Sequence, residues 1–200
     1  MASKRNHIPR TVSDKVFAEY DHGCAICGGA NPQLHHIDGD SSNNIEINLI
    51  PLCPNCHLID QHNPTKKIEK EKIELFRKFK DPTILYPQFH PLYLRMEFLF
   101  SVNEDSDFDE LKEKATDLID FIQELEKGTY YAKKIGELIK APRKARSYNM
   151  HDPMLERRLE AEHLEDGDEY KTQLNENKEK IFFLCVELLR YQPWLPLKHD

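Results

Sequence analysis

Two Cys-x-x-Cys pairs, with 25 residues between them, constrain this chain more than any other feature of its sequence. The first pair is Cys24 and Cys27, and the second is Cys53 and Cys56. Two thiolates three positions apart at a tight turn can face one ion, and a second such pair completes a tetrahedral four-cysteine site. Glycines follow the first pair and prolines flank the second, which favours tight turns at both. We therefore predict a structural Zn²⁺ held by these four side chains.

The rest of the composition favours a soluble, cytoplasmic protein, in which paired cysteines bind metal rather than form disulfides. The longest apolar run, residues 181–186, has six residues, far short of the ~20 that span a bilayer. The N-terminus lacks the apolar core of a signal peptide, so no membrane partner is expected. The fifth cysteine, Cys185, lies within that apolar run and is expected to pack in a core.

Other classes of zinc site do not fit the positions of the histidines. A two-Cys, two-His finger needs a His about twelve residues after its second Cys, where this chain has Asp40. A zinc deaminase combines His-x-Glu with Pro-Cys-x-x-Cys. Here the residue two positions after His36 is Asp38 rather than Glu, and Leu52 rather than Pro directly precedes Cys53. The His-Glu-x-x-His motif of metalloproteases is also missing from the sequence.

The segment between the cysteine pairs predicts a compact strand-strand-helix (ββα) unit. Residues 34–37 have the pattern of a short strand, and residues 38–44 form a loop rich in turn-forming side chains, among them Asp38 and Asp40. The apolar residues at positions 45, 47 and 49 alternate with polar ones, which indicates a second strand. A helix is expected to begin at His57, directly after the second cysteine pair.

In combination, these residues resemble the HNH endonucleases, in the subgroup that carries a four-cysteine zinc site. The resemblance rests on the two cysteine pairs, on His35-His36-Ile37, on Asn48-Leu49 and on the His57 that follows Cys56. It also includes the lead-in helix before Cys24, so it covers about residues 8–62. It implies a ββα-metal, treble-clef-like zinc module in residues 1–64.

The resemblance also implies a role for each signature residue. His36 corresponds to the general base, which takes a proton from the water that attacks phosphorus. His35 and His57 correspond to ligands of a single catalytic Mg²⁺, Mn²⁺ or Zn²⁺, and Asn48 to a structural residue that holds the loop carrying the base. Because adjacent strand residues point to opposite faces, His35 and His36 can serve one site only if the strand twists or ends there.

The third ligand of the catalytic ion is left open. Many members of the family have a second His four residues after the last signature His, but Gln61 stands at that position here. Asp60 lies on the same side of a continuous helix as His57, whereas His62 is rotated by about 140°. His62 can serve if the helix ends early, as the Asn63-Pro64 dipeptide favours. A two-ligand site completed by water is the remaining alternative.

The rest of the chain shows helical periodicity, and its residues 101–200 carry the whole excess of acidic over basic residues. The net charge is −7, and residues 101–200 contain 16 basic and 23 acidic residues. The overall expectation is an α+β fold, with a mostly α-helical half in residues 65–200 and a further boundary near 101–107. Residues 66–80 and 141–148 are basic and are candidates for contact with DNA. Helices are expected over residues 65–80, 92–102, 108–125, 130–139, 153–164 and 170–191.

The function expected from the resemblance is hydrolysis of DNA phosphodiester bonds, with double-stranded DNA as the partner, in a setting such as restriction or antiphage defence. One alternative is a non-catalytic, zinc-stabilised module that binds nucleic acid without cutting it. Another is a nuclease subunit that stays silent until a partner activates it, because a net charge of −7 weakens unassisted binding to DNA. The helical half would then bind that protein partner or a second copy of the chain.

Overall fold

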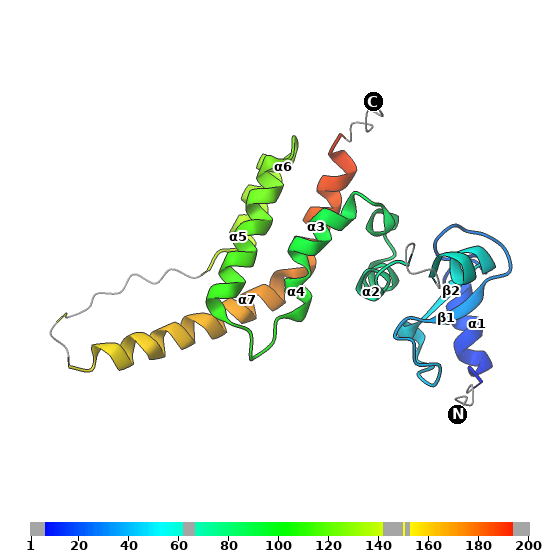
Figure 1. The fold of residues 1–200 in the computed structure, drawn as a ribbon, viewed down its shortest axis with the longest axis horizontal. Helices are drawn as coiled ribbons and strands as arrows, with labels where there is room; N and C mark the ends of the chain where they lie inside the picture. The colour runs from blue at the N-terminus through cyan, green and yellow to red at the C-terminus, as the bar shows by residue number, and fades with distance from the viewer. Residues whose placement is uncertain (1–6, 62–66, 142–149, 151–152, 194–200) are drawn as a thin grey trace. The chain divides into compact units, whose positions relative to one another are not determined.

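The computed structural model describes residues 7–61, 67–141, 150 and 153–193. The chain forms two compact units, Met1–Tyr86 and Pro87–Asp200 (Figure 1). The structure is mixed and mostly helical, with a small two-stranded sheet in the first unit, which confirms the α+β expectation at this coarse level. No helix in the described ranges is both long and apolar enough to cross a membrane.

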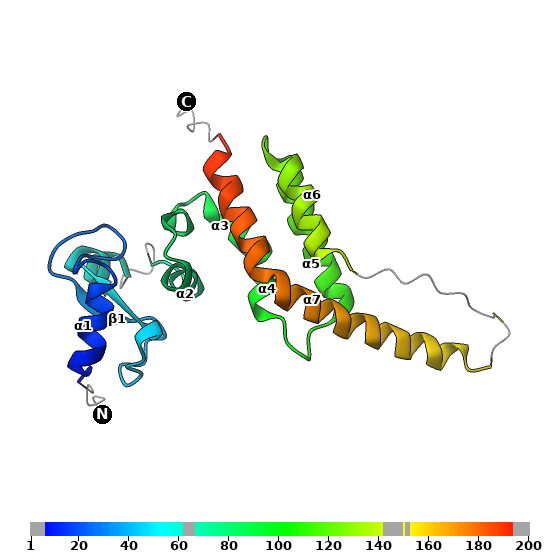
Figure 2. The same ribbon diagram turned by 180° about the vertical axis from the view of Figure 1, so that it is seen from behind.

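The first unit is built around an antiparallel hairpin of β1 (Gln33–His36) and β2 (Leu49–Leu52). In its register, His36 pairs with Leu49 and Gln33 pairs with Leu52. Short helices complete the unit, and the first of them, α1, packs against β2 and lies beside the hairpin in Figure 2. These helices are α1 (Arg10–Ala18), the 3₁₀ helix η1 (Glu46–Asn48), the π-helix η2 (Asn55–Gln61), α2 (Lys70–Phe79) and the 3₁₀ helix η3 (Pro82–Leu85).

The second strand lies later in the chain than the alternating pattern predicts. Ile45, which precedes η1, and Ile47, which lies within it, are 57% and 56% exposed, whereas all four residues of β2 are buried. Burial on both faces, rather than alternation, therefore marks this strand. Pro51 is accommodated in the hairpin because each strand has a free edge, and its carbonyl oxygen accepts a hydrogen bond from the backbone N–H of Ala25 at 2.8 Å.

Arg77 fastens α2 to the sheet. Its guanidinium is almost fully buried and donates from Nε to the carbonyl oxygen of Leu49 at 2.9 Å and from a terminal nitrogen to that of Glu46 at 3.1 Å. The other terminal nitrogen forms a 2.6 Å ion pair with Glu19, just after α1. Residues 67–86, which sequence periodicity groups with the helical half, thus lie in the first unit. The core of this unit contains Val16, Leu49, Ile50, Leu52, Ile73, Phe76 and Ile84.

The second unit is a helical bundle. Helix α5 packs against α6 and α3, and α7 packs against α6, α3 and α4. The loop of residues 102–107 lies inside this unit. Cys185 is fully buried in the bundle core, as expected from the apolar run around it. The helices are α3 (Phe89–Met96), α4 (Phe98–Ser101), α5 (Phe108–Glu124), α6 (Gly128–Ile139) and α7 (Leu155–Tyr191).

Helix α7 is one continuous helix of 37 residues, where the sequence predicts two helices, 153–164 and 170–191. The acidic, glycine-containing stretch between them favours a break. Tertiary packing outweighs this local preference and keeps the helix continuous. Gly167 and Tyr170 are both buried, and the Tyr170 hydroxyl donates to the carbonyl oxygen of Ile139 at 2.8 Å. Most of the basic stretch 141–148 lies outside the described residues.

Candidate functional site

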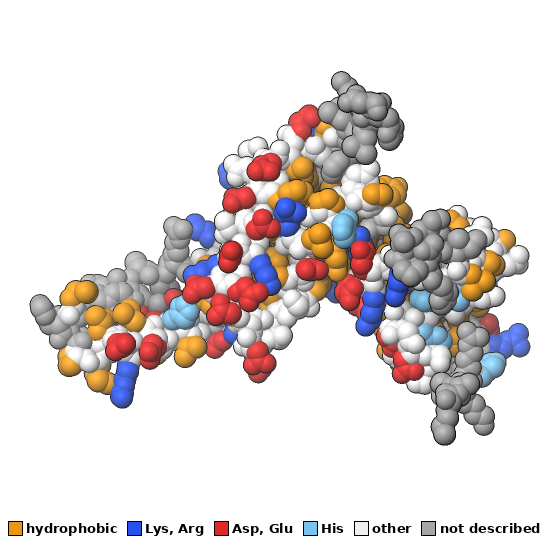
Figure 3. Space-filling model, in the orientation of Figure 1, with side chains coloured by type: hydrophobic (Ala, Val, Ile, Leu, Met, Phe, Trp, Pro, Cys, Tyr) orange, Lys and Arg blue, Asp and Glu red, His pale blue; other side chains and the backbone are white. Residues whose placement is uncertain are grey.

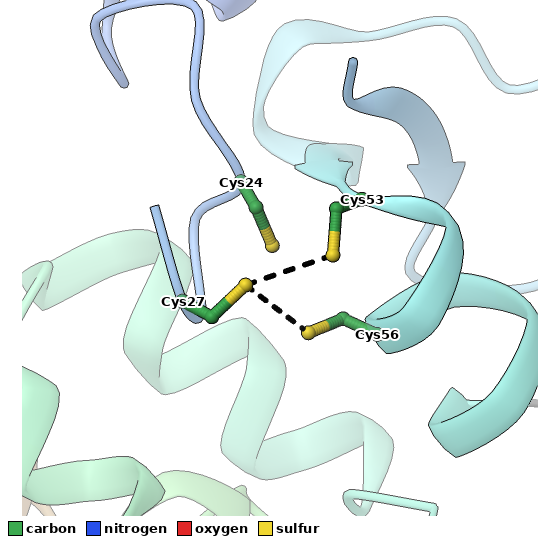
Figure 4. Close-up of side chains that lie close together, drawn as sticks. All are labelled: Cys24, Cys27, Cys53 and Cys56. Carbon is green, nitrogen blue, oxygen red and sulfur yellow. Dashed lines mark hydrogen bonds between the residues drawn. The ribbon is translucent and has the colours of Figure 1, made fainter. Parts of the chain in front are cut away.

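Four cysteine side chains meet at one end of the hairpin (Figure 4). Their sulfur atoms all lie within 4.8 Å of one another, and Cys27 Sγ lies 3.6 Å from the sulfurs of both Cys53 and Cys56. A tetrahedral zinc ion with Zn–S bonds of about 2.3 Å separates its sulfur ligands by about 3.8 Å. The cluster of four cysteines, predicted from spacing alone, is therefore compact enough to hold one metal ion.

Local backbone hydrogen bonds shape the first half of this cluster. The N–H of Cys24 donates to the carbonyl oxygen of Gly29 at 2.9 Å, and the N–H of Gly28 donates to that of Cys24 at 2.8 Å. Gly28 has a φ of +70°, a conformation that favours glycine. A Cβ atom at Gly29 would lie 3.2 Å from Cys27 Sγ and 3.4 Å from Cys53 Cβ. The two glycines therefore allow the turn to close and the second pair to approach.

The second half of the cluster begins where β2 ends. Cys53 follows the last strand residue, and the N–H of His57 donates to the Cys53 carbonyl oxygen at 2.8 Å to open η2. The backbone N–H of Cys56 lowers the pKa of the Cys53 thiol to about 7, from an ordinary value of 9.0. Burial raises the pKa of Cys56. Cys53 is therefore the first of these two thiols to become the thiolate that binds metal.

Two of the candidate catalytic-metal ligands, one on β1 and one on η2, come together. The rings of His35, on β1, and His57, in the first turn of η2, have their centroids 5.0 Å apart at an interplanar angle of 72°. His57 is 8% exposed, so this pair lies at the edge of the core rather than on the open surface. The side chain of Asp60 and all of His62, the two alternatives for a third ligand, lie outside the described residues.

His36 lies next to this pair and is fixed by a different element. Its Nε2 lies 2.9 Å from Oδ1 of Asn44, in the loop between the strands. An amide oxygen only accepts hydrogen bonds, so Nε2 of the imidazole is the donor in this contact. Strand β1 ends at His36, which is the condition for adjacent histidines to serve one site.

Asn48 closes the loop that follows His36. It is 8% exposed, and its side-chain oxygen accepts the backbone N–H of Asp38 at 3.0 Å. Its side-chain nitrogen donates to Asp38 Oδ1 and to the carbonyl oxygen of Asn43, both at 2.9 Å. Its own carbonyl oxygen accepts the N–H of Ile37 at 2.9 Å. These four hydrogen bonds all lie within twelve residues of chain and hold the loop in one conformation.

Asp38 and Asp40 belong to the same loop network. Asp38 also accepts from the Asn43 side chain at 2.6 Å and from the N–H of Asp40 at 2.8 Å, and the Asn48 amide is the main cause of its lowered pKa. Asp40 accepts from both the backbone and the side chain of Ser42, which lowers its pKa. Both carboxylates are exposed and stabilise turns, which is the role expected for them from the sequence.

Two contributors to this site were not foreseen from the sequence. Asn44 is one of several polar residues in the loop, and nothing in the local pattern distinguishes it as the partner of His36. Arg77 lies in a helix whose cations look like solvent-exposed or phosphate-binding groups. One sequence signal did indicate that Arg77 is buried. It lies four residues after the apolar Ile73, and residues four apart share a helix face.

The structure thus gathers the four cysteines in one cluster, and places His35 beside His57, His36 against Asn44, and Asn48 in the loop that follows β1. Among the described residues, the four cysteines form the only group of three or more His, Cys, Asp or Glu side chains that lie close enough together to hold a metal ion. No family model matches this chain, and no curated protein or solved structure is found to be similar to it.

Proposed function

We propose that the first unit is a metal-dependent endonuclease of the HNH type that hydrolyses DNA phosphodiester bonds. The observation that carries the proposal is the pairing of His35, on β1, with His57, on η2, whose rings lie 5.0 Å apart, while His36 is the next residue on β1. The cysteine cluster lies at the base of η2, next to His57, and is proposed to hold a structural Zn²⁺ that fixes this helix on the hairpin.

In this proposal, His36 is the general base. Its Nε2–H is held by Asn44 at 2.9 Å, so that Nδ1 accepts a proton from the water that attacks phosphorus. The P–O3′ bond then breaks and leaves a 5′-phosphate. His35 and His57 would bind the catalytic divalent ion, which supplies Lewis-acid stabilisation of the phosphate and of the leaving oxygen.

Asn48 supports the reaction by position rather than by contact with DNA. Its four hydrogen bonds keep residues 37–48 in a closed loop, and that loop carries Asn44. The base is therefore oriented by Asn44, which lies in a loop that the buried Asn48, the last residue of η1, keeps closed. Such pre-orientation lowers the entropic cost of reaching the transition state.

Cleavage of supercoiled plasmid by the purified chain tests the proposal, with Mg²⁺, Mn²⁺ or EDTA in parallel reactions. His36→Ala is expected to lower the cleavage rate by about 10²- to 10⁴-fold, the usual contribution of a general base. Its zinc content and circular dichroism should match those of wild type. His163→Ala, an exposed histidine on α7, is the matched control and should leave the rate unchanged.

Three results would lead to a different assignment. Equal cleavage by His36→Ala and wild type would exclude His36 as the base. If zinc-loaded, folded wild type binds plasmid in a gel-shift assay without cutting it under any metal, the binding-only module becomes the better assignment. If it neither binds nor cuts alone but cuts when a protein partner is added, the partner-gated subunit does.

A further inference from the structure

A cavity in the helical unit is separate from the candidate nuclease site. It has a volume of about 550 Å³ and opens between α5 and α6, with the buried Tyr170 of α7 in its lining. Figures 1 and 2 both show α5 and α6 side by side. Pockets that bind small molecules in proteins typically enclose about 300–1,000 Å³. The size of the cavity therefore suits an organic ligand.

The floor of the cavity is apolar. Ala115, Ile119 and Ile139 contribute to it, and the hydroxyl of Tyr170 is already used in its hydrogen bond to the Ile139 carbonyl oxygen. Gly136 leaves the hollow open, because a Cβ built there would meet only Ile119 Cδ1, at 3.9 Å. A ligand that fills the floor must present apolar surface, since the floor offers it no spare hydrogen-bonding group among these side chains.

The rim of the cavity is positively charged. Lys133 and Gly136 lie on α6, and Lys140 directly follows the last residue of this helix, seven positions after Lys133. All three residues line the cavity, with the glycine between the two lysines in the chain. Both lysines are exposed, and in the described part of the chain neither forms an ion pair with a carboxylate. Lys112, on α5, is instead paired with Asp109 at 2.5 Å.

The surroundings of this rim make its charge distinctive. Residues 101–200 carry the whole acidic excess of the chain, and Figure 3 shows acidic side chains spread over the helical unit. The lining contains one acidic residue, Glu137. Its carboxylate forms a 3.8 Å ion pair with Lys134, a residue that does not line the cavity. Two ammonium groups that form no ion pair with any described carboxylate, beside an apolar hollow, attract a ligand with an anionic group attached to an apolar body.

We propose that this cavity binds an organic anion, with the apolar body of the ligand over Gly136 and its carboxylate, sulfonate or phosphate group at Lys133 or Lys140. An inorganic anion would leave the apolar floor unfilled, and a neutral apolar molecule would make no use of the lysines. This inference is independent of the nuclease proposal, because it uses residues of the second unit alone.

A pair of fluorescent probes with the same ring system tests the proposal on the full chain. 8-Anilinonaphthalene-1-sulfonate has an anionic group, and N-phenyl-1-naphthylamine is its uncharged counterpart. At low ionic strength, wild type is expected to bind the sulfonate with a Kd at least tenfold lower than that of the amine. Raising the salt concentration to about 0.5 M should reduce this difference, since exposed charges are screened.

Variants then locate the binding. The double variant Lys133→Ala/Lys140→Ala should raise the Kd of the sulfonate at least tenfold and change that of the amine less than twofold. Gly136→Leu should raise both constants at least tenfold by filling the hollow, and it keeps α6 intact because leucine favours helix more than glycine does. Lys114→Ala/Lys180→Ala removes one lysine from α5 and one from α7, both outside the cavity, and should change neither constant. Thermal unfolding confirms that each variant is folded.

Several outcomes would overturn the proposal. Equal affinity of wild type for the two probes would show that the lysines do not select an anion. Sulfonate binding that survives both Gly136→Leu and the lysine double variant would place the probe elsewhere. If folded wild type binds neither probe but binds a peptide rich in Asp and Glu in a lysine-dependent way, the rim is a docking surface for protein and the small-anion proposal is wrong.

Discussion

Replacing Arg77 by methionine should destabilise the first unit strongly, because this buried side chain joins three separate segments of the chain. The substitution removes the donors to the carbonyl oxygens of Leu49 and Glu46 and leaves the Glu19 carboxylate with Lys80, 3.0 Å away, as its remaining cation. Methionine fills a similar volume, so the loss is chiefly of hydrogen bonds and of the ion pair rather than of packing.

The pKa of Glu19 gives the size of the electrostatic part. Its hydrogen bond from Arg77 is the largest cause of a pKa lowered from 4.5 to about 2. At about 1.4 kcal/mol per unit this corresponds to about 3 kcal/mol, and solvent screening of a carboxylate that is 26% exposed reduces it to about 2 kcal/mol. Two orphaned carbonyl oxygens add about 1–2 kcal/mol. We expect Arg77→Met to cost about 3 kcal/mol of unfolding free energy.

Native-state hydrogen exchange of the β1 and β2 amides measures this loss in the first unit directly. Lys80→Met is the matched control, since Lys80 is about half exposed and its loss should cost less than about 1 kcal/mol. Because the folded pKa of Glu19 is depressed, its stabilisation is complete above about pH 4.5 and disappears as the pH falls toward about 2. Arg77→Met should flatten this acid dependence. A loss no greater than that of Lys80→Met, or an unchanged pH dependence, would refute the reasoning.

Three further predictions concern the metal cluster, the base and the bundle. Cys53→Ser should lower the zinc content measured by mass spectrometry and abolish exchange protection in β2, while the helical unit keeps its protection; retained zinc would contradict the cluster as the metal site. Asn44→Ala should reduce plasmid cleavage about 10- to 100-fold with zinc content unchanged, whereas Asn103→Ala, a loop asparagine of the helical unit, should not; equal rates would remove Asn44 from the orientation of His36. Tyr170→Phe should cost about 1 kcal/mol in the urea unfolding of the helical unit, because it leaves the Ile139 carbonyl oxygen without its donor; no loss would show that this bond contributes nothing.

Much of the helical unit could be predicted from the sequence, because its signals are local. Apolar residues that recur every three or four positions specify a helix whatever lies around it, and α5 spans Phe108–Glu124 where residues 108–125 were predicted. Asp107 caps this helix by accepting the N–H of Glu110 at 2.8 Å, as expected of an aspartate just before an apolar period. The break predicted before residue 170 failed because buried packing at Gly167 and Tyr170 outweighs a local preference.

The candidate site divides in the same way between local and distant effects. The sequence alone determined the cysteine cluster, because a Cys-x-x-Cys turn already aims two sulfurs at one point and two such turns in one small unit can share it. The resemblance to HNH endonucleases also singled out His35, His36 and His57 from the sequence. Only the tertiary structure decided that β2 begins at Leu49, that Asn44 holds His36, and that Arg77 is buried. Each of these depends on partners 8 to 58 residues away in the chain, whose contacts no local period encodes.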